Sequence, residues 1–414
     1  MTIDVQAATR TFLAQTEVHM VSYLEACLHC GQCADACLFY RTSGDPRHTP
    51  AYKLFPIAKA LKAQKWPLKW LGLAPKLTEK DLTEWEELIF DTCTMCGRCT
   101  EVCPMSIDIA SIVGQARKAF VAAGLGPADL LQAAENSRDH GSPLGLTPEK
   151  LVDRLEWLAD DQEVEMVLDK AKADVLLTVS SIEAMKYPTS LSAMAKILTH
   201  AGVDWTFSSK GYEATNFGFL AGKPDIAKTM ILRIVEAAEA VGAKTVVIPE
   251  CGHAYGVMRW GGANILGRPL PFEVLHITEY MAKLKREGKL KLKPYDKPMT
   301  YHDPCQVSRR GGAAADARYI LEDFATDFHE MTPTAEMNWC CGGGGGVQAI
   351  SRGADLRHKV FKIKMDQVAA TGTGTLVSAC ANCRVTMEES KAHWKWDGGL
   401  ESLVEIVAEH LDEG

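Results

Sequence analysis

The chain has 414 residues, of which 47% are hydrophobic and 24% charged, and its formal net charge is −8. These values exclude a disordered or fibrous protein. They also argue against nucleic acid as a partner, because nucleic-acid binding needs a basic surface. The length leaves room for two or three domains. Residues 1–10 lack the apolar segment of a signal peptide, and no run of about 20 apolar residues predicts a membrane span.

The first 126 residues are expected to form a helix-rich module that carries two dense cysteine motifs. Helical spacing occurs at residues 52–61, 82–90 and 107–123. Residues 127–173 contain no cysteine and are rich in Leu, Glu and Asp, which favours a helical connector.

From residue 174 onward, short apolar strands alternate with helices, and this layout predicts small parallel sheets. Strands are expected at residues 175–179, 244–248, 299–301 and 374–378, and helices at 190–201, 225–241, 314–324 and 359–370. Because the layout occurs twice, residues 174–265 and 298–395 are interpreted as two copies of one α/β unit. The predicted fold class is therefore mixed: a helix-rich module at residues 1–126, then two α/β repeats.

Two runs of four cysteines share the spacing C-x2-C-x2-C-x3-C, although Leu38 stands where the first run would end in proline. Clustering at such short gaps favours metal or redox chemistry in a reducing cytoplasm over disulfides. Zinc usually takes paired C-x2-C modules, whereas in two-cluster ferredoxins the fourth cysteine of each run ligates the other cluster. We therefore expect two [4Fe–4S] cubanes. Their expected ligands are Cys27, Cys30, Cys33 and Cys103 for the first, and Cys93, Cys96, Cys99 and Cys37 for the second.

Five further cysteines lie in the last third of the chain: Cys305, Cys340, Cys341, Cys380 and Cys383. Two adjacent cysteines project in different directions, and the glycines at residues 342–346 allow the backbone to approach closely. Cys305 and Cys380 follow predicted strands, where open α/β sheets place their sites. The alternative is an incomplete site that holds an ordinary cubane or zinc.

The motifs HDPC at residues 302–305, CCG at 340–342 and CANC at 380–383 resemble those of the heterodisulfide reductase family, in particular its HdrD-like group. The resemblance covers residues 20–395, including the ferredoxin motifs. It implies a dicluster ferredoxin-like domain (1–126), a helical connector (127–173), a degenerate CCG repeat (174–297) and an intact CCG repeat (298–414). It also implies that the five C-terminal cysteines bind a non-cubane [4Fe–4S] cluster that cleaves disulfides, with Cys305 and Cys341 among its catalytic residues.

The first repeat departs from this pattern, because Ser181 and Asn216 occupy the places of Cys305 and Cys340. Only Cys251 remains, so we expect no cluster there. By pseudo-symmetry Cys251 should face the remaining cluster, as a redox partner with His253 as a proton donor. A buried remnant cysteine is the alternative. His302 belongs to the HDPC motif, and a structural role is preferred for it.

A degenerate first repeat with the sequence ECGHA at residues 250–254 looks similar to the DsrK-type subunits of the membrane complex linked to dissimilatory sulfite reductase. That resemblance implies an oxidoreductase acting on sulfur. Electrons would pass from a partner through the cubanes to the non-cubane cluster, which reduces or forms a disulfide or trisulfide, for example on a small sulfur-carrier protein. The expected partners include a membrane quinone or haem b subunit, which would hold the chain at the inner face of the cytoplasmic membrane.

Two other functions fit the same modules. One is the iron–sulfur relay subunit of a glycolate or lactate oxidase or of a glycerol-3-phosphate dehydrogenase complex, and the other is a non-catalytic scaffold. We expect no bound flavin or NAD, because the glycines at 342–346 lack the G-x-G-x-x-G context. The segment 53–71, with Trp66 and Trp70, is either a docking surface for a membrane subunit or a cover over the ferredoxin module.

Overall fold

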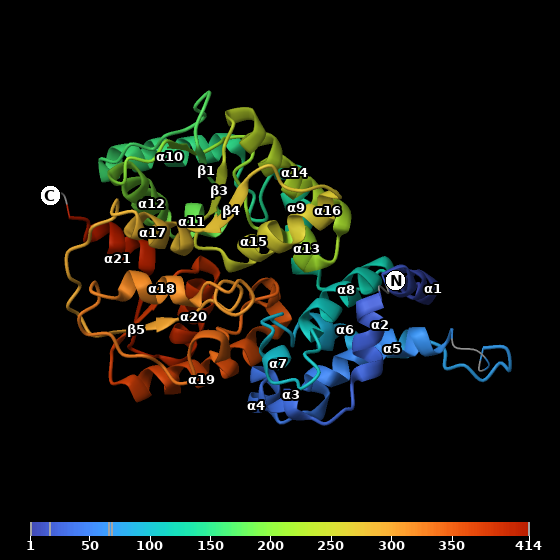
Figure 1. Cartoon of the computed structure of the whole chain (residues 1–414). Coiled ribbons are helices and arrows are strands. Elements are labelled where there is room, and N and C mark those ends of the chain that lie inside the picture. Colours follow the sequence, from blue (N-terminus) through green and yellow to red (C-terminus); the bar gives the residue numbers. More distant parts are fainter. Residues whose placement is uncertain (1, 16–17, 65–66, 68, 413–414) are drawn as a thin grey trace.

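The computed structural model describes residues 2–15, 18–64, 67 and 69–412, and its N-terminal part is built from helices (Figure 1). A capping box between Thr78 and Asp81 begins α6, and the Asp108 side chain caps α8. The elements are α1 (Val5–Ala14), α2 (Val18–Ala26), α3 (Gln32–Asp35), α4 (Leu38–Ser43), η1 (Pro46–His48), η2 (Pro50–Leu54), α5 (Phe55–Lys62), α6 (Glu79–Phe90), α7 (Arg98–Glu101) and α8 (Ile109–Ala122). The helix-rich module is thus confirmed.

Two longer helices follow, α9 (Ala128–His140) and α10 (Pro148–Gln162), where the sequence predicts a helical connector. The side chain of Thr147 caps α10, and Pro148 occupies the first helical position, where its missing N–H costs nothing. Helix α9 packs against helices of the first repeat, and so does α10. These two helices therefore cover the first repeat.

The first repeat contains a four-stranded parallel sheet in the order β2-β1-β3-β4. The strands β1 and β3 were predicted, whereas β2 is only two residues long and β4 shows no alternating pattern in sequence. The strands are β1 (Val175–Leu177), β2 (Trp205–Thr206), β3 (Thr245–Ile248) and β4 (Glu273–His276). The helices are α11 (Ser181–Lys186), α12 (Pro188–His200), α13 (Phe217–Ala221), α14 (Pro224–Val241), α15 (Gly252–Gly256), η3 (Val257–Gly261), α16 (Gly262–Leu266) and α17 (Ile277–Arg286).

The second repeat has a three-stranded parallel sheet in the order β5-β6-β7. Its third strand was not predicted, because Gly399 and Glu401 give it a polar sequence. The strands are β5 (Met299–His302), β6 (Thr375–Ser378) and β7 (Gly399–Ser402). The helices are α18 (Ala314–Leu321), η4 (Ala335–Met337), η5 (Val347–Ala349), η6 (Ser351–Gly353), α19 (Ala354–Thr371), α20 (Ala381–Trp394) and α21 (Leu403–Glu409).

The two repeats share one apolar core. Helix α12 packs on α21 and α17 on α18, and residues such as Leu191, Met281, Ile320 and Val404 belong to one buried cluster. In Figure 1 the first repeat, in green and yellow, lies directly against the second, in orange and red, with the blue N-terminal part beside them. Within the described residues, no helix combines the length and apolar character needed to span a membrane.

Candidate functional site

The five C-terminal cysteines gather at the carboxyl ends of β5 and β6. Cys305 follows β5, Cys380 precedes α20 and Cys383 lies in its first turn, while Cys340 and Cys341 come from the loop between η4 and η5. All five are buried and free of disulfides. The sulfurs of Cys305 and Cys340 lie 3.9 Å apart. The structure therefore brings these predicted site residues together.

The glycine-rich loop, residues 342–346, closes one side of this group. A Cβ atom at Gly343 would lie 1.9 Å from Thr386 Oγ1, and one at Gly344 would lie 2.9 Å from the Thr94 carbonyl oxygen. No larger residue fits between these neighbours. The loop thereby joins the C-terminal cysteines to the second ferredoxin-type motif.

The thiols of this group suit metal ligation. Hydrogen bonds from the thiols of Cys340 and Cys383 lower the pKa of Cys341 well below its ordinary value. Donation from the Cys383 thiol likewise lowers the pKa of Cys380. Thiolates are the ligands of iron–sulfur clusters, so this buried, sulfur-rich donor set fits such a cluster. Lys364 is also buried here, and burial lowers its pKa to about 8.

His302 lies beside two of the five C-terminal cysteines, whereas the sequence favoured a structural role for it. Its ring is fully buried, and neither ring nitrogen has a hydrogen-bond partner among the described residues. One ring nitrogen and the sulfurs of Cys341 and Cys383 all lie within 4.8 Å of one another. Unpaired buried polar atoms are costly, so the imidazole is placed to face a ligand of this site. Its position in the HDPC motif is the signal that points to it.

The expected ligands of the second cubane meet in one small cavity, whose lining includes Cys37, Cys93, Cys96 and Cys99. Lys53 lines the same cavity and donates a hydrogen bond of 2.8 Å to Thr92 Oγ1. Burial raises the pKa of the Cys37 thiol, while the charge of Lys53 lowers it. A buried cation beside these thiols favours their ionised, ligating form.

The expected ligands of the first cubane lie closer to solvent. Cys30 is exposed, while Cys27 and Cys103 are half-buried and Cys33 is buried. Gly31 has a φ of 85°, in the left-handed region that glycine tolerates, and this turn begins α3. Burial, with the charges of Cys27 and Cys30 adding to it, raises the pKa of Cys33. These four cysteines remain the predicted ligands of the first cubane.

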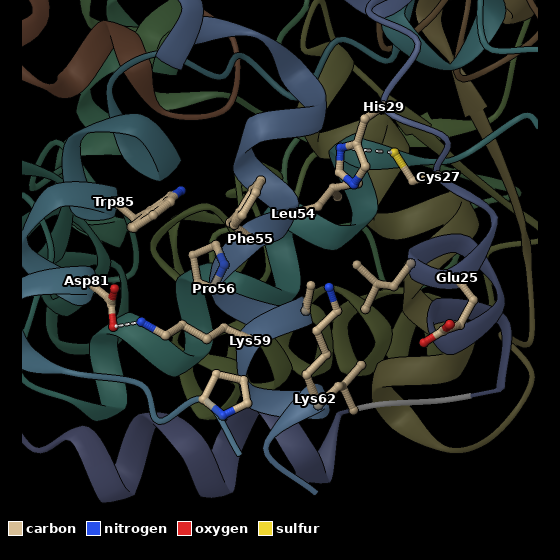
Figure 2. A pocket seen from close by; sticks show the side chains of 14 residues that line it. Glu25, Cys27, His29, Leu54, Phe55, Pro56, Lys59, Lys62, Asp81 and Trp85 are labelled. Atoms are coloured by element: carbon tan, nitrogen blue, oxygen red, sulfur yellow. Dashed lines mark hydrogen bonds and ion pairs between the residues drawn. The ribbon is translucent and has the colours of Figure 1, made fainter. Parts of the chain in front are cut away.

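A cavity of about 630 Å³ opens beside the first ferredoxin-type motif, and Figure 2 shows its lining side chains. His29 Nδ1 lies 4.0 Å from the Cys27 sulfur. The rings of Phe55 and Trp85 form an apolar wall. An ion pair of 2.6 Å joins Lys59 to Asp81 at the cavity. The lining includes none of the five C-terminal cysteines, so this cavity belongs to the first motif alone.

Arg117 fastens the second ferredoxin-type motif to both repeats. Its guanidinium is fully buried and donates hydrogen bonds to the carbonyl oxygens of Leu220 (2.8 Å), Cys93 (3.1 Å) and Gly345. From the second repeat, Arg309 donates to the Cys96 carbonyl at 2.9 Å. The ferredoxin motif and the glycine-rich loop are thereby held in one arrangement. Sequence patterns carried no signal for Arg117.

The first repeat holds its predicted residues differently. The Asn216 side chain accepts a hydrogen bond from Phe219 N and donates one to the Ala227 carbonyl, both at 2.9 Å, so it caps α13. Cys251 is buried behind β3, 3.5 Å from Thr215 Oγ1. Burial raises the pKa of the Cys251 thiol to about 12.

His253, expected to act as a proton donor beside Cys251, accepts a hydrogen bond of 2.6 Å at Nε2 from Gly345 N. Burial lowers the pKa of His253 to about 4, so the ring is neutral at pH 7. This bond positions the glycine-rich loop. Proton donation by His253 stays a prediction, and it would have to use Nδ1.

Direct hydrogen bonds join the two repeats at their strand ends. The Ala381 amide, next to Cys380, donates a hydrogen bond of 2.7 Å to the carbonyl of Glu250, next to Cys251. A further cavity of about 650 Å³ lies along this seam, and we call it the seam cavity. Its lining includes Ser181, Thr215, Gln348 and Val385. It thus reaches both the residue beside Cys251 and the end of the glycine-rich loop.

Comparison with known proteins gives two family matches. A 4Fe-4S dicluster domain matches residues 23–107, and a cysteine-rich domain, CCG, matches residues 299–388. The chain is 31% identical to the D-type subunit of the dihydromethanophenazine:CoB–CoM heterodisulfide reductase of Methanosarcina barkeri, over 94% of both chains. It is 25% identical to the Hdr-like menaquinol oxidoreductase iron–sulfur subunit of Archaeoglobus profundus, over 94% of this chain and 79% of that protein. It is 26% identical to the EtfAB:quinone oxidoreductase of Syntrophomonas wolfei, over 87% of this chain and 54% of that protein.

Proposed function

The chain belongs to the HdrD-like heterodisulfide reductase family, and we propose that it is the iron–sulfur subunit of a complex that reduces or forms a sulfur–sulfur bond. The observation that carries this proposal is the buried group of five cysteines beside the second ferredoxin-type motif. A simple relay would need four cysteine ligands for a cubane. The additional cysteine, with His302 facing two of the sulfurs, favours a site that also handles substrate.

The proposed parts keep the predicted boundaries of 1–126, 127–173, 174–297 and 298–414. The two ferredoxin-type motifs would hold two cubanes with exchanged fourth ligands, as predicted. The five C-terminal cysteines would hold a non-cubane cluster, and the first repeat none. When bound, these clusters supply one-electron transfer and, at the five-cysteine site, the capacity to cleave a sulfur–sulfur bond.

The chain's own residues would then bind and shield the substrate. The seam cavity is lined by Thr215, which contacts Cys251, and by Gln348, which follows the glycine-rich loop, so substrate would approach from this side. Cys251 remains a neutral thiol at pH 7, because its pKa is raised to about 12 by burial. It is therefore suited to exchange with a substrate sulfur only after losing its proton. Lys364, buried among the thiols, would offset their negative charge.

Membrane partners are part of this proposal. Relatives are named for menaquinol, dihydromethanophenazine or quinone chemistry, so a membrane quinone or haem b subunit would supply electrons at the exposed first motif. Attachment to it would hold the chain at the inner face of the cytoplasmic membrane. The substrate would be a disulfide or trisulfide, for example on a small sulfur-carrier protein. Trp70, 79% exposed, is a candidate contact for the partner; Trp66 lies outside the described residues.

Anaerobic iron and sulfide counting, with EPR of the chain oxidised in the presence of a thiol, tests the proposal. Three clusters of four irons predict about twelve irons. Cys341→Ser should remove a thiol-dependent signal and about four irons. Cys251→Ser is the matched control, because it replaces a buried cysteine outside the ligand set and should keep the iron. A wild-type count of about eight irons, the content of two cubanes, without a thiol-sensitive signal would contradict the proposal.

A relay function is the second candidate, favoured by the likeness to EtfAB:quinone oxidoreductase. In that case the chain would pass electrons between a flavin subunit and quinone, as in a glycolate or lactate oxidase or a glycerol-3-phosphate dehydrogenase complex. Co-purification with a flavoprotein, together with no disulfide turnover by the reduced chain, would favour the relay. Disulfide turnover that is lost in Cys341→Ser would exclude it.

A further inference from the structure

In the first repeat, buried carboxyl groups occupy the region where the second repeat places its cysteines. Glu183 is fully buried and Glu213 is 3% exposed. They lie beside Ser181, which follows β1 as Cys305 follows β5, and Cys251, which follows β3 as Cys380 follows β6. We call Glu183, Glu213, Thr215 and Cys251 the vacated site.

Glu213 is linked to Cys251 through Thr215. Its Oε1 accepts a hydrogen bond of 2.7 Å from Thr215 N, and its Oε2 one of 3.0 Å from Ser181 N. The hydroxyl of Thr215 lies 3.5 Å from the Cys251 sulfur. The Thr215 side chain also hydrogen-bonds to the Glu213 carboxyl group and opposes the rise in its pKa. Because a hydroxyl accepts one proton while it donates another, Thr215 is placed to relay protons between the carboxyl group and the thiol.

One carboxyl oxygen of Glu183 has no hydrogen-bond partner among the described residues. Its Oε1 accepts a hydrogen bond of 3.1 Å from Glu250 N, whereas Oε2 is buried without a partner among the described residues. An ionised carboxylate in this position would be costly. Burial, followed by the charge of Glu250, raises the pKa of Glu183 well above its ordinary value. The carboxyl group of Glu183 therefore favours its protonated form.

Charged groups around the vacated site come from several elements. Glu250 follows β3, and Arg384 on α20 lies 3.4 Å from it and also 3.4 Å from Glu405 on α21. The Arg384 charge opposes the rise in the pKa of Glu183. Burial raises the pKa of Glu213 to about 7. Burial also raises the pKa of Glu250 to about 7. The site thus combines a carboxyl group that favours its protonated form, Glu183, with neighbours that exchange protons near neutral pH.

Solvent reaches this site through the seam cavity, which is lined by both Ser181 and Thr215. A purely structural carboxyl group would satisfy both oxygens, as Glu213 does. The Oε2 oxygen of Glu183 has no such partner within the part of the chain that the structure describes. The pair instead offers two carboxyl groups that can carry protons at these strand ends, and Glu213 exchanges its proton near neutral pH.

We propose that Glu183 and Glu213 form a proton-holding site that supplies the two protons consumed when a sulfur–sulfur bond is reduced at the five-cysteine site. This inference rests on the proposed function. The reaction is RS–SR′ + 2 e⁻ + 2 H⁺ → RSH + R′SH, in which one S–S bond breaks and two S–H bonds form. The two electrons come from the partner's reduced quinol or equivalent donor. The proton of Glu213 leaves by way of Thr215, and the carboxyl groups are protonated again through the seam cavity.

Infrared spectroscopy of the anaerobic full chain tests, without turnover, whether Glu183 and Glu213 hold protons. The carbonyl band of a protonated carboxylic acid should be present at pH 8.5, and Glu183→Gln should remove it. Glu213→Gln should remove a component that titrates near pH 7. Glu183→Gln keeps the acceptor for Glu250 N and leaves only the unpaired position changed, so it is expected to fold. A wild-type chain without this band, or a band that neither substitution changes, overturns the proposal.

Proton uptake during a single turnover, followed with a pH-indicator dye, tests whether these carboxyl groups supply protons to the reaction. Glu213→Gln and Thr215→Val should slow uptake on the order of 10²-fold, the lower end of what a positioned acid contributes. Glu279→Gln is the matched control, a half-buried carboxyl group in the same repeat that pairs with Arg259. Unchanged uptake in both variants overturns the supply role. If the wild-type chain reduces no disulfide, the proposed function fails, while the infrared result still decides whether the site holds protons.

Discussion

Replacing Arg117 with methionine is expected to loosen the contact between the second ferredoxin-type motif and the glycine-rich loop. The guanidinium is completely buried and donates to carbonyl oxygens of three separate segments, at Cys93, Leu220 and Gly345. Burial lowers the pKa of Arg117 only to about 10, so the side chain is charged at pH 7. Methionine fills part of the space but donates no hydrogen bond.

The magnitude follows from the carbonyl groups left behind. Each buried acceptor that loses its donor costs about 1–3 kcal/mol. The two well-formed bonds, to Leu220 and Cys93, therefore predict a loss of about 2–6 kcal/mol in the free energy of unfolding. Native proteins have only about 5–15 kcal/mol in total, so the substitution removes a large share. Because Gly345 also loses its donor, iron bound by the neighbouring cysteines should fall as well.

Anaerobic urea unfolding and iron content of purified Arg117→Met measure both effects. Arg138→Met is the matched control, because Arg138 is 48% exposed in its side chain and pairs with Asp139 at the surface. The control should change stability by no more than about 0.5 kcal/mol. If Arg117→Met unfolds at the same urea concentration as this control and keeps its iron, Arg117 does not fasten the motif to the loop.

Three further predictions follow from the same geometry. Cys305→Ser should abolish disulfide turnover and the thiol-dependent EPR signal but leave the signals of the ferredoxin-type motifs; full turnover in this variant would refute the assignment. Glu213 has a pKa of about 7 in the folded chain, above the value of about 4.3 in an unfolded one. Its contribution to stability is complete below about pH 4.3 and is lost as pH rises through 7. Glu213→Gln should flatten that fall in chemical unfolding measured from pH 4.5 to 8. Trp70 and Leu73 are 79% and 70% exposed, so changing both to serine should leave the unfolding temperature unchanged while weakening the pelleting of the chain with liposomes or with a membrane subunit. Equal pelleting of variant and wild type would remove this segment from the docking surface.

Local patterns predicted the elements that have strong local signals. The apolar runs that became β1, β3, β5 and β6 were recognised, as were the long helices α14 and α19. Strands β2, β4 and β7 were missed because they are defined by the strands beside them, β4 by β3. Trp205 and Thr206 pair with β1, and residues 399–402 pair with β6. Such edge strands depend on tertiary pairing, which overrides local preference.

Cysteine spacing pointed to the ligand groups, because the chemistry of a cluster requires several thiols within a short reach. The residues around them carry no such spacing. Arg117 comes from the middle of an ordinary helix, and its partners at Cys93, Leu220 and Gly345 are far apart in sequence. Sequence patterns do not distinguish Glu183 and Glu213 from surface carboxylates, and only the structure shows that they are buried. Sequence therefore predicted which cysteines could serve as metal ligands but not the buried polar groups that surround them.

The first ferredoxin-type motif has an exposed cysteine, whereas the five C-terminal cysteines are all buried. This difference in burial should decide which group dioxygen oxidises first. Cys30 of the first motif is exposed and lies two residues from Leu28, which is 80% exposed, whereas each of the five C-terminal cysteines is at most 5% exposed. Oxidation of cysteine follows exposure and thiolate character. Dioxygen should therefore damage the proposed cluster of the first motif before the one held by the five C-terminal cysteines. Under the proposed function, a preparation handled aerobically would keep the five-cysteine site intact while losing the transfer of electrons from its partner.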